Sequence, residues 1–354
     1  CSGWGTSMRQ RKLGQSDITV SEICLGSMTW GTQNDYTEAS AQINFASERG
    51  VNFIDTAELY PTIPLSAETQ GDTEAIIGRY MKEKNCRDKF IIATKIGGPG
   101  IAHLRSGEKI TPTSITKALE GSLKRLQTDY VDLYQLHWPN RGHYHFRKNW
   151  NYEPKVCGGC ENDNETLEIL AALDHHIKAG NIRAIGLSNE TAWGTATFLR
   201  LAESHGLPRM VSIQNEYSLL CRWFDLDLAE LAVNENIGLL SYSPLATGIL
   251  SGKYLNSAGP KGSRASIKPG LDGRLTQFTD PPVQAYLDIA AQHRLRPEQM
   301  ALAFCLQRPF IGSVIIGATS LEQLDIALGS SEIKLTKGIL DDIQKVYRHY
   351  PAPL

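Results

Sequence analysis

Residues 53–61 read FIDTAELYP, an apolar pair that runs into a carboxylate and then reaches a tyrosine followed by proline. Phe53 and Ile54 have the character of a buried strand, whereas Asp55 is costly to bury without a partner. The proline after Tyr60 blocks a helix and bends the chain. The stretch therefore predicts a short buried strand that ends in a polar loop carrying a tyrosine.

The same pattern occurs eight times along the chain, and helical patterns alternate with the strands. The eight runs are nearly continuous in apolar residues, as in parallel strands that are buried on both faces. They are EICLGSM (22–28), NFIDTA (52–57), FIIATKI (90–96), YVDLYQLH (130–137), IRAIGLSN (182–189), MVSIQNEY (210–217), IGLLSYS (237–243) and SVIIGAT (313–319). Eight strand–helix alternations without a break in composition predict an α/β protein, a single (β/α)8 barrel of the TIM type.

Helical spacing of apolar residues supports this alternation. Thr111 can cap a helix over 112–126, which has a proline in its first turn. Leu226 begins another stripe of leucines with helical spacing, and Thr336 can cap a last helix near the C-terminus. These segments are expected to surround the barrel.

The chain has 354 residues, more than the ~250 that a minimal barrel needs. The excess is expected in an N-terminal β-hairpin at 9–21, in long loops at 138–163 and 254–280, and in the C-terminal helix. Both loops follow strands, so they are expected on the C-terminal face, where barrels carry their active sites. Residues 1–7 have the composition of a tag remnant, which leaves 8–354 as one expected domain.

Composition narrows the class of protein. The 41% hydrophobic and 21% charged fractions are typical of soluble globular proteins. A net charge of -2 with no long run of one sign argues against nucleic acid as a partner. No apolar run approaches the ~18–20 residues that span a membrane, so no membrane partner is expected. Seven scattered cysteines favour a reducing compartment, and we expect the cytoplasm. The oligomeric state stays open.

Four chemically active residues belong to three consecutive strand ends and one loop: Asp55, Tyr60, Lys95 and His137. An ammonium lowers the pKa of a nearby phenol, and a carboxylate keeps that ammonium charged. The sequence thus predicts a tyrosine that can give up its proton near neutral pH, to a carbonyl oxygen as hydride reaches the carbon. The alternative is a purely structural ion pair between Asp55 and Lys95.

At this point the motifs resemble those of the aldo-keto reductase superfamily. They are NFIDTAELYP, IIATKIG, GSLKRLQTDYVDLYQLHWP, IRAIGLSNE, IQNEYSLL and YSPLATGILSGKY, in order over the chain from Met8. The sequence is most similar to the bacterial Tas-like branch, through ETQG (68–71) and the ending YPAP. The potassium-channel β-subunit branch is also similar, through SRAS (263–266).

The resemblance implies an NADP(H)-dependent oxidoreductase that interconverts small carbonyl compounds and alcohols. It implies that Tyr60 is the general acid/base, with Asp55, Lys95 and His137 completing a catalytic tetrad. It implies a cofactor site made of Gly26, Ser27, Met28, Thr29, Ser188, Asn189, Gln214, Tyr242, Ser243, Leu245, Gly248, Lys253, Ser263, Arg264, Gly317, Thr319 and Gln323. Ser263 and Arg264 resemble ligands of the adenosine 2′-phosphate, which favours NADPH over NADH.

Two features depart from the resemblance or qualify it. Ile326 and Ala327 stand where the family often has an acidic residue and an asparagine near the adenine, which removes two polar contacts. A different class of function is the alternative: an NADPH-sensing regulatory subunit similar to the potassium-channel β-subunits, in which binding a partner is the main output.

The loop at 138–163 holds the remaining candidates. Cys157 and Cys160 form a C-x-x-C, and two histidines at 143 and 145 precede them, so zinc, a redox pair and free thiols are all open. We expect no metal, because the histidine spacing is a poor match. Trp138, in a loop that also carries aromatic residues at 144, 146, 150 and 152, and Trp30 after the first strand are expected to form an apolar substrate wall.

Overall fold

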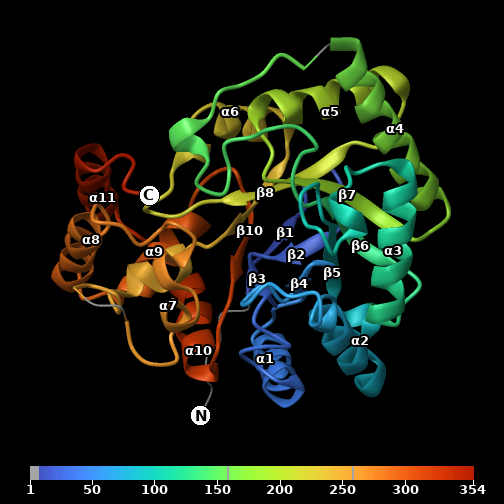
Figure 1. Ribbon diagram of the computed structural model, residues 1–354. Helices are drawn as coiled ribbons and strands as arrows, with labels where there is room; N and C mark the ends of the chain where they lie inside the picture. The colour runs from blue at the N-terminus through green and yellow to red at the C-terminus, as the bar shows by residue number, and fades with distance from the viewer. Residues whose placement is uncertain (1–7, 158, 257–258) are drawn as a thin grey trace.

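The computed structural model describes residues 8–157, 159–256 and 259–354, so the expected tag remnant at 1–7 lies outside the described residues. Eight parallel strands of the described chain close into one barrel, in the order β10, β3, β4, β5, β6, β7, β8, β9. Figure 1 shows these strands at the centre with the helices around them. The predicted (β/α)8 barrel is confirmed.

Seven of the eight predicted strand segments contain the observed strand, and the last one is displaced. The strands are β3 (Ile23–Gly26), β4 (Phe53–Asp55), β5 (Ile91–Ile96), β6 (Val131–Leu136), β7 (Ile182–Ser188), β8 (Met210–Glu216), β9 (Gly238–Tyr242) and β10 (Ile311–Ile316). The prediction for β10, 313–319, begins two residues and ends three residues too late, because the strand includes Gly312 and stops at Ile316. A Cβ at Gly312 would lie 3.2 Å from the Gly238 Cα, so glycine there allows β9 and β10 to approach closely.

Eleven α-helices occur in the described residues, and the two for which caps were predicted begin where expected. The eleven are α1 (Tyr36–Glu48), α2 (Asp72–Lys84), α3 (Pro112–Leu126), α4 (Gly159–Lys178), α5 (Ala192–His205), α6 (Asp227–Glu235), α7 (Arg264–Ile267), α8 (Asp280–Gln292), α9 (Pro297–Leu306), α10 (Leu321–Gly329) and α11 (Lys337–His349). The side chains of Thr111 and Thr336 cap α3 and α11 as predicted. Leu226 is a wrong prediction, because it precedes α6 with a non-helical backbone and is 72% exposed.

None of the helices in the described part of the chain is long and apolar enough to cross a lipid bilayer.

The predicted N-terminal hairpin closes the bottom of the barrel. Its strands β1 (Gln10–Lys12) and β2 (Thr19–Ser21) pair antiparallel. Leu13, Ile18 and Val20 of the hairpin pack in one apolar cluster with inward-facing strand residues, among them Phe53 and Leu240. This plug leaves the opposite, C-terminal end of the strands as the open end.

Side chains alternate along each strand, so the barrel interior is built in layers. The lower layer holds Phe53, Ala93 and Leu133 in the hairpin cluster. Two residues further along the same strands, and therefore one layer higher, come Asp55, Lys95 and Gln135. The barrel is thus apolar at its base and polar at the level of the strand ends.

The two long loops lie at the C-terminal end, as predicted. Residues from both, such as Phe146 and Arg264, line the same cavity as Asp55 and Tyr60. The first loop is shorter than predicted, because α4 already begins at Gly159. The second loop contains the short helix α7 before α8 begins.

Candidate active site

A buried ion pair lies at the centre of the open end of the barrel. The Lys95 Nζ donates to the Asp55 Oδ2 at 2.6 Å and to the Thr56 carbonyl at 2.8 Å. The Lys95 side chain has no exposed area, and that of Asp55 is 3% exposed. Burial alone would lower the pKa of Lys95, but Asp55 and Tyr60 outweigh it and leave that pKa raised. Lys95 is therefore a fixed cation, and Asp55 is not an unpaired burial.

The other oxygen of Asp55 is held by two amides. The Gln135 Nε2 donates to the Asp55 Oδ1 at 3.2 Å, and the Gln214 Nε2 donates to it at 2.9 Å. The sequence reasoning missed Gln135, although its place two residues after Leu133 puts it on the inward face of β6. The two amides hold the carboxylate in position for Lys95.

Tyr60 lies above the ion pair on the loop after β4. The Lys95 Nζ is 3.4 Å from the Tyr60 hydroxyl, and the Tyr60 carbonyl accepts from the Gly71 N–H at 3.0 Å. The loop is tied to β5 by Glu58, which receives the Gly97 N–H at 2.7 Å and pairs with Arg105. These contacts position the tyrosine at the wall of the cavity.

The protonation of Tyr60 differs from the expectation. Burial raises the pKa of Tyr60 above its usual value, although the Lys95 charge acts to lower it. The expectation of a phenol that gives up its proton readily near neutral pH is therefore wrong for the free hydroxyl. At neutral pH Tyr60 is protonated, which is the state that a general acid needs.

His137 follows β6 and faces the same cavity. Its ring centroid is 5.8 Å from that of Tyr60, and the Asn189 Nδ2 donates to its carbonyl at 2.9 Å. Burial, together with the Lys95 charge, lowers the pKa of His137 well below its usual value. The imidazole is neutral at pH 7 and can act as a hydrogen-bond donor without carrying a charge.

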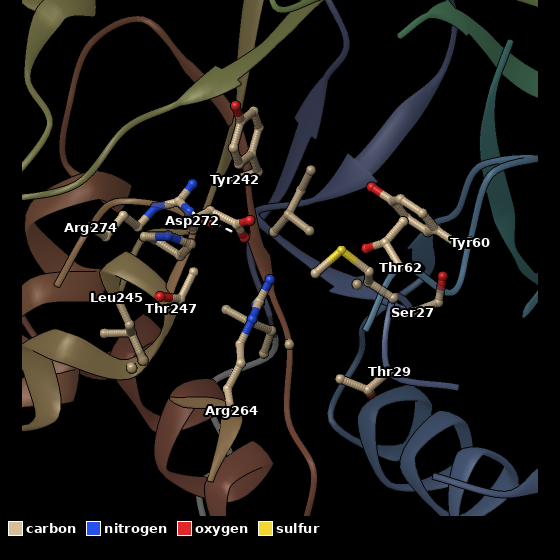
Figure 2. Close-up of a pocket in the computed structure, with 18 of the residues that line it drawn as sticks. Ser27, Thr29, Tyr60, Thr62, Tyr242, Leu245, Thr247, Arg264, Asp272 and Arg274 are labelled. Carbon is tan, nitrogen blue, oxygen red and sulfur yellow. Dashed lines mark ion pairs between the residues drawn. The ribbon is translucent and has the colours of Figure 1, made fainter. Parts of the chain in front are cut away.

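One large cavity of about 1360 Å³ joins these residues to the predicted cofactor residues. It is larger than the ~300–1,000 Å³ typical of small-molecule pockets. All seventeen residues of the predicted cofactor set line it, as do Asp55, Tyr60 and His137, while Lys95 lies behind Tyr60. Figure 2 shows Tyr60 and Tyr242 on different sides of this space, with the Arg264 side chain reaching toward its middle.

Several residues expected to contact the cofactor also bind one another. The Tyr242 hydroxyl donates to the Asn189 Oδ1 at 2.7 Å, and the Ser188 hydroxyl donates to the Gln214 carbonyl at 2.9 Å. Because Gln214 also donates its amide to Asp55, one residue connects the expected nicotinamide region to the ion pair. The two regions are therefore parts of one polar network.

The cationic end of the cavity fits a phosphate group. The Arg264 Nε and the Ser263 Oγ are enclosed and have no hydrogen-bond partner among the described residues. Burial, together with the nearby Arg274, lowers the pKa of Arg264 to about 10, which still leaves it charged at pH 7. Unpaired donors on a half-buried cation and on the adjacent serine suit an anion that bonds to both.

Glu216 at the end of β8 ties the two long loops together, and the sequence reasoning did not single it out. Arg274 of the second loop binds both of its carboxylate oxygens, at 2.8 and 3.1 Å, and Arg147 of the first loop bonds to the same carboxylate. The feature of the sequence that could have identified Glu216 is its position two residues after Gln214, at the open end of β8. This ion pair holds both loops over the cavity.

At the far wall Gln323 of α10 stabilises the loop that precedes this helix. Its Oε1 accepts from the Thr319 backbone N–H at 3.0 Å and from the Thr319 hydroxyl at 3.1 Å. Ile326 and Ala327 also line the cavity, so the departure noted in the sequence lies at the wall and makes it apolar there.

The two tryptophans of the expected substrate wall lie in different places. Trp138 lines the cavity, with its ring 4.9 Å from that of His137 and its indole N–H bonded to the Pro99 carbonyl. Trp30 does not line it: the side chain is fully buried and donates its N–H to the Gln42 side chain at 3.0 Å. The expectation for Trp30 is wrong because its side chain packs in the buried apolar core and not at the cavity wall. Of the other aromatic residues in the first loop, Phe146 lines the cavity.

The C-x-x-C and the two histidines do not come together as a metal site in the described residues, where no group of three or more metal-ligating side chains occurs. His145 bonds its Nε2 to the Glu190 carbonyl at 2.9 Å. Cys157 and Cys160 are free thiols at the surface.

The comparisons with known proteins agree with this geometry. The model of the family described as "Aldo/keto reductase family" matches residues 22–348. The chain is 42% identical to "Protein tas" of Escherichia coli strain K12, over 98% of this chain and 100% of that protein. It is 30% identical to "Uncharacterized oxidoreductase YrpG" of Bacillus subtilis strain 168, over 98% and 97%. It is 39% identical to an "Aldo-keto reductase" of Babesia bovis, over 67% of this chain and 87% of that protein. The chain therefore belongs to the aldo/keto reductase family, a family of oxidoreductases.

Proposed function

We propose that this protein is an NADPH-dependent reductase that converts aldehydes and ketones to alcohols, with Tyr60 as the general acid. The observation that carries the proposal is the position of Lys95, which contacts both the Asp55 carboxylate and the Tyr60 hydroxyl at one cavity. An ion pair with only a structural role has no need of a phenol at that point. The similarity over nearly the whole chain to Protein tas and to a protein named as an oxidoreductase favours an enzyme over the cofactor-sensing regulatory subunit.

Bound NADPH would supply a hydride to the carbonyl carbon. Tyr60 would donate its proton to the carbonyl oxygen, and the adjacent Lys95 would stabilise the phenolate that this leaves. The neutral His137 ring would donate a hydrogen bond to the same oxygen and help to orient it. Hydride and proton together convert the C=O group to an alcohol.

The direct test is NADPH oxidation, followed by absorbance, with an activated aromatic aldehyde. Turnover that depends on Tyr60 supports the proposal, and the absence of turnover with every aldehyde tried contradicts it. We further propose that residues 8–354 act as one catalytic domain in the cytoplasm, which the single barrel and the scattered cysteines support.

The preference for NADPH is proposed to depend on Arg264. Replacing Arg264 with methionine keeps a long unbranched side chain but removes a half-buried cation beside Ser263. We expect the KM for NADPH to rise about 10- to 100-fold, as for lost hydrogen bonds to a charged group. The KM for NADH serves as the internal control and should change little. Equal increases for both cofactors would contradict a role in binding the 2′-phosphate.

The pH dependence should differ between the two directions of reaction. The pKa of Tyr60 is raised and that of His137 is lowered well below 6.5, so neither group titrates between pH 6 and 8. We expect kcat/KM for aldehyde reduction, which needs protonated Tyr60, to be flat over this range. Alcohol oxidation needs the phenolate, so its kcat/KM should rise about tenfold per pH unit below the pKa of Tyr60. Initial rates in both directions in constant-ionic-strength buffers check this, and a reduction rate that falls from pH 6 to 8 would contradict it.

A further inference from the structure

His143 lines the cavity and carries a hydrogen-bond donor that the protein itself does not use. The residue is only 4% exposed and lines the cavity together with Trp138 and Phe146. Its Nδ1 accepts the backbone N–H of His145 at 3.2 Å, so in the neutral ring the proton must sit on the Nε2. Burial and the neighbouring basic groups lower the pKa of His143 to about 3, which keeps the ring neutral.

The Nε2–H of His143 is open to a ligand. It has no hydrogen-bond partner in the part of the chain that the structure describes, and it is not among the polar atoms enclosed away from solvent. The residue is almost entirely buried and lines the cavity, so a ligand in the cavity lies within reach of this ring. A donor that keeps access to the cavity can bond to water, and a ligand that accepts its hydrogen bond takes the place of that water.

The surroundings of this donor favour an anion. The basic groups that act on His143 are His145, Lys148 and Arg141. Burial lowers the pKa of His145 to about 4, so at pH 7 only Lys148 and Arg141 are charged. Arg141 is neutralised by Glu190. Lys148 also lines the cavity, and it forms no ion pair within the described residues. A neutral N–H and an ammonium without a counter-ion thus lie on the same wall.

An apolar stretch of wall separates this pair from the catalytic tyrosine. Ring contacts run without a break from Tyr60 to His137 (5.8 Å), to Trp138 (4.9 Å), to Phe146 (6.0 Å) and to His143 (5.5 Å). A ligand with its reacting carbonyl at Tyr60 would therefore lie along aromatic faces before it reached His143. The spacing suits a substrate with a ring, or a chain of similar length, between two polar ends.

We propose that His143 and Lys148 bind a carboxylate at the far end of the substrate, so that the substrate class is an aldehyde or ketone with a remote carboxylate. The Nε2–H of His143 donates to one carboxylate oxygen and the Lys148 ammonium balances the charge. One hydrogen-bond donor and one positive charge match the single negative charge of a carboxylate. This inference rests on the proposed function, since it names the substrate class of the same site.

The test compares 4-formylbenzoate with its methyl ester, which has the same shape without the charge. The wild-type enzyme should have a lower KM for 4-formylbenzoate than for the methyl ester. His143→Phe and Lys148→Met should each reduce that preference about tenfold, through KM for the carboxylate, with kcat and the ester little changed. His143→Gln, which retains an N–H donor, should restore part of it. A ratio of the two kcat/KM values that is the same in wild type and both variants would overturn the proposal.

A binding measurement separates this inference from the proposed function. Titration calorimetry with 4-methylbenzoate and NADP⁺ involves no turnover, because this carboxylate has no carbonyl or hydroxyl group to react, so it reads the carboxylate contact even if no aldehyde is reduced. We expect the affinity to fall about tenfold in His143→Phe. Equal affinity in wild type and variant would overturn the carboxylate contact, whereas loss of turnover alone would count only against the reductase.

Discussion

Replacing Tyr60 with phenylalanine is expected to lower kcat for aldehyde reduction by about 10²- to 10⁴-fold, the usual contribution of a positioned proton donor. The variant loses only the hydroxyl that lies 3.4 Å from the Lys95 Nζ. The ring keeps its place beside His137, so the cavity keeps its shape and NADPH should bind with nearly unchanged affinity. Stopped absorbance assays give the turnover, and cofactor fluorescence gives the binding.

The matched control is Tyr130→Phe. Tyr130 precedes β6 at the opposite end of the strand from His137, and its ring lies against the Arg87 guanidinium. Removing that hydroxyl should leave turnover unchanged. A Tyr60→Phe enzyme with wild-type turnover would show that another group donates the proton. A variant that loses NADPH affinity as well would show that the hydroxyl contributes to binding and would weaken its assignment as the acid.

The barrel and its polar centre follow from local patterns. A buried strand is recognised as a short apolar run, and its side chains point alternately inward and outward. This alternation is sufficient to place Asp55 and Lys95 in one layer above Phe53 and Ala93 from the sequence alone. The same rule reaches Gln135, two residues after Leu133, although the prediction did not use it. Local alternation therefore gives most of the central site.

Features that depend on long-range packing were not predictable in this way. Trp30 follows a strand end just as Trp138 does, yet one is fully buried against Gln42 and the other lines the cavity. The path of the loop decides between these outcomes, and sequence spacing does not reveal it. The pKa of Tyr60 was predicted with the wrong sign because the nearby charge could be foreseen and the extent of burial could not.

The arginine cluster at Glu216 illustrates the same limit. Arg147 and Arg274 come from two loops that are more than a hundred residues apart in sequence. Nothing near either arginine predicts that both bind the carboxylate of Glu216. The same is true of Lys148 and His143, whose proposed contact with the substrate depends on how the first loop folds over the barrel. Loop residues that carry specificity are therefore the part of the site that needs the structure.

The Asp55–Lys95 pair should have a large effect on stability as well as on activity. Replacing Lys95 with methionine leaves the Asp55 carboxylate buried with two amides but without its cation. Removing one partner of a buried pair typically costs about 3–5 kcal/mol. We expect the free energy of unfolding to fall by about that amount, with a loss of turnover similar to that of Tyr60→Phe. Thermal unfolding followed by circular dichroism, together with the aldehyde assay, measures both effects.

The double variant Asp55→Asn/Lys95→Met separates the two roles of the pair. Removing both charges leaves no unpaired buried ion, and asparagine keeps an oxygen that can accept from Gln135 and Gln214, so most of the lost stability should return. Turnover should not return, because no cation remains to stabilise the Tyr60 phenolate. The control is Lys337→Met, which breaks the exposed pair with Asp341 and should change stability little. If the double variant were as unstable as the single one, the stability lost in Lys95→Met would have a cause other than the unpaired charge of Asp55. If it regained turnover, Lys95 would have no electrostatic role in proton transfer, and the proposed mechanism would have to be abandoned.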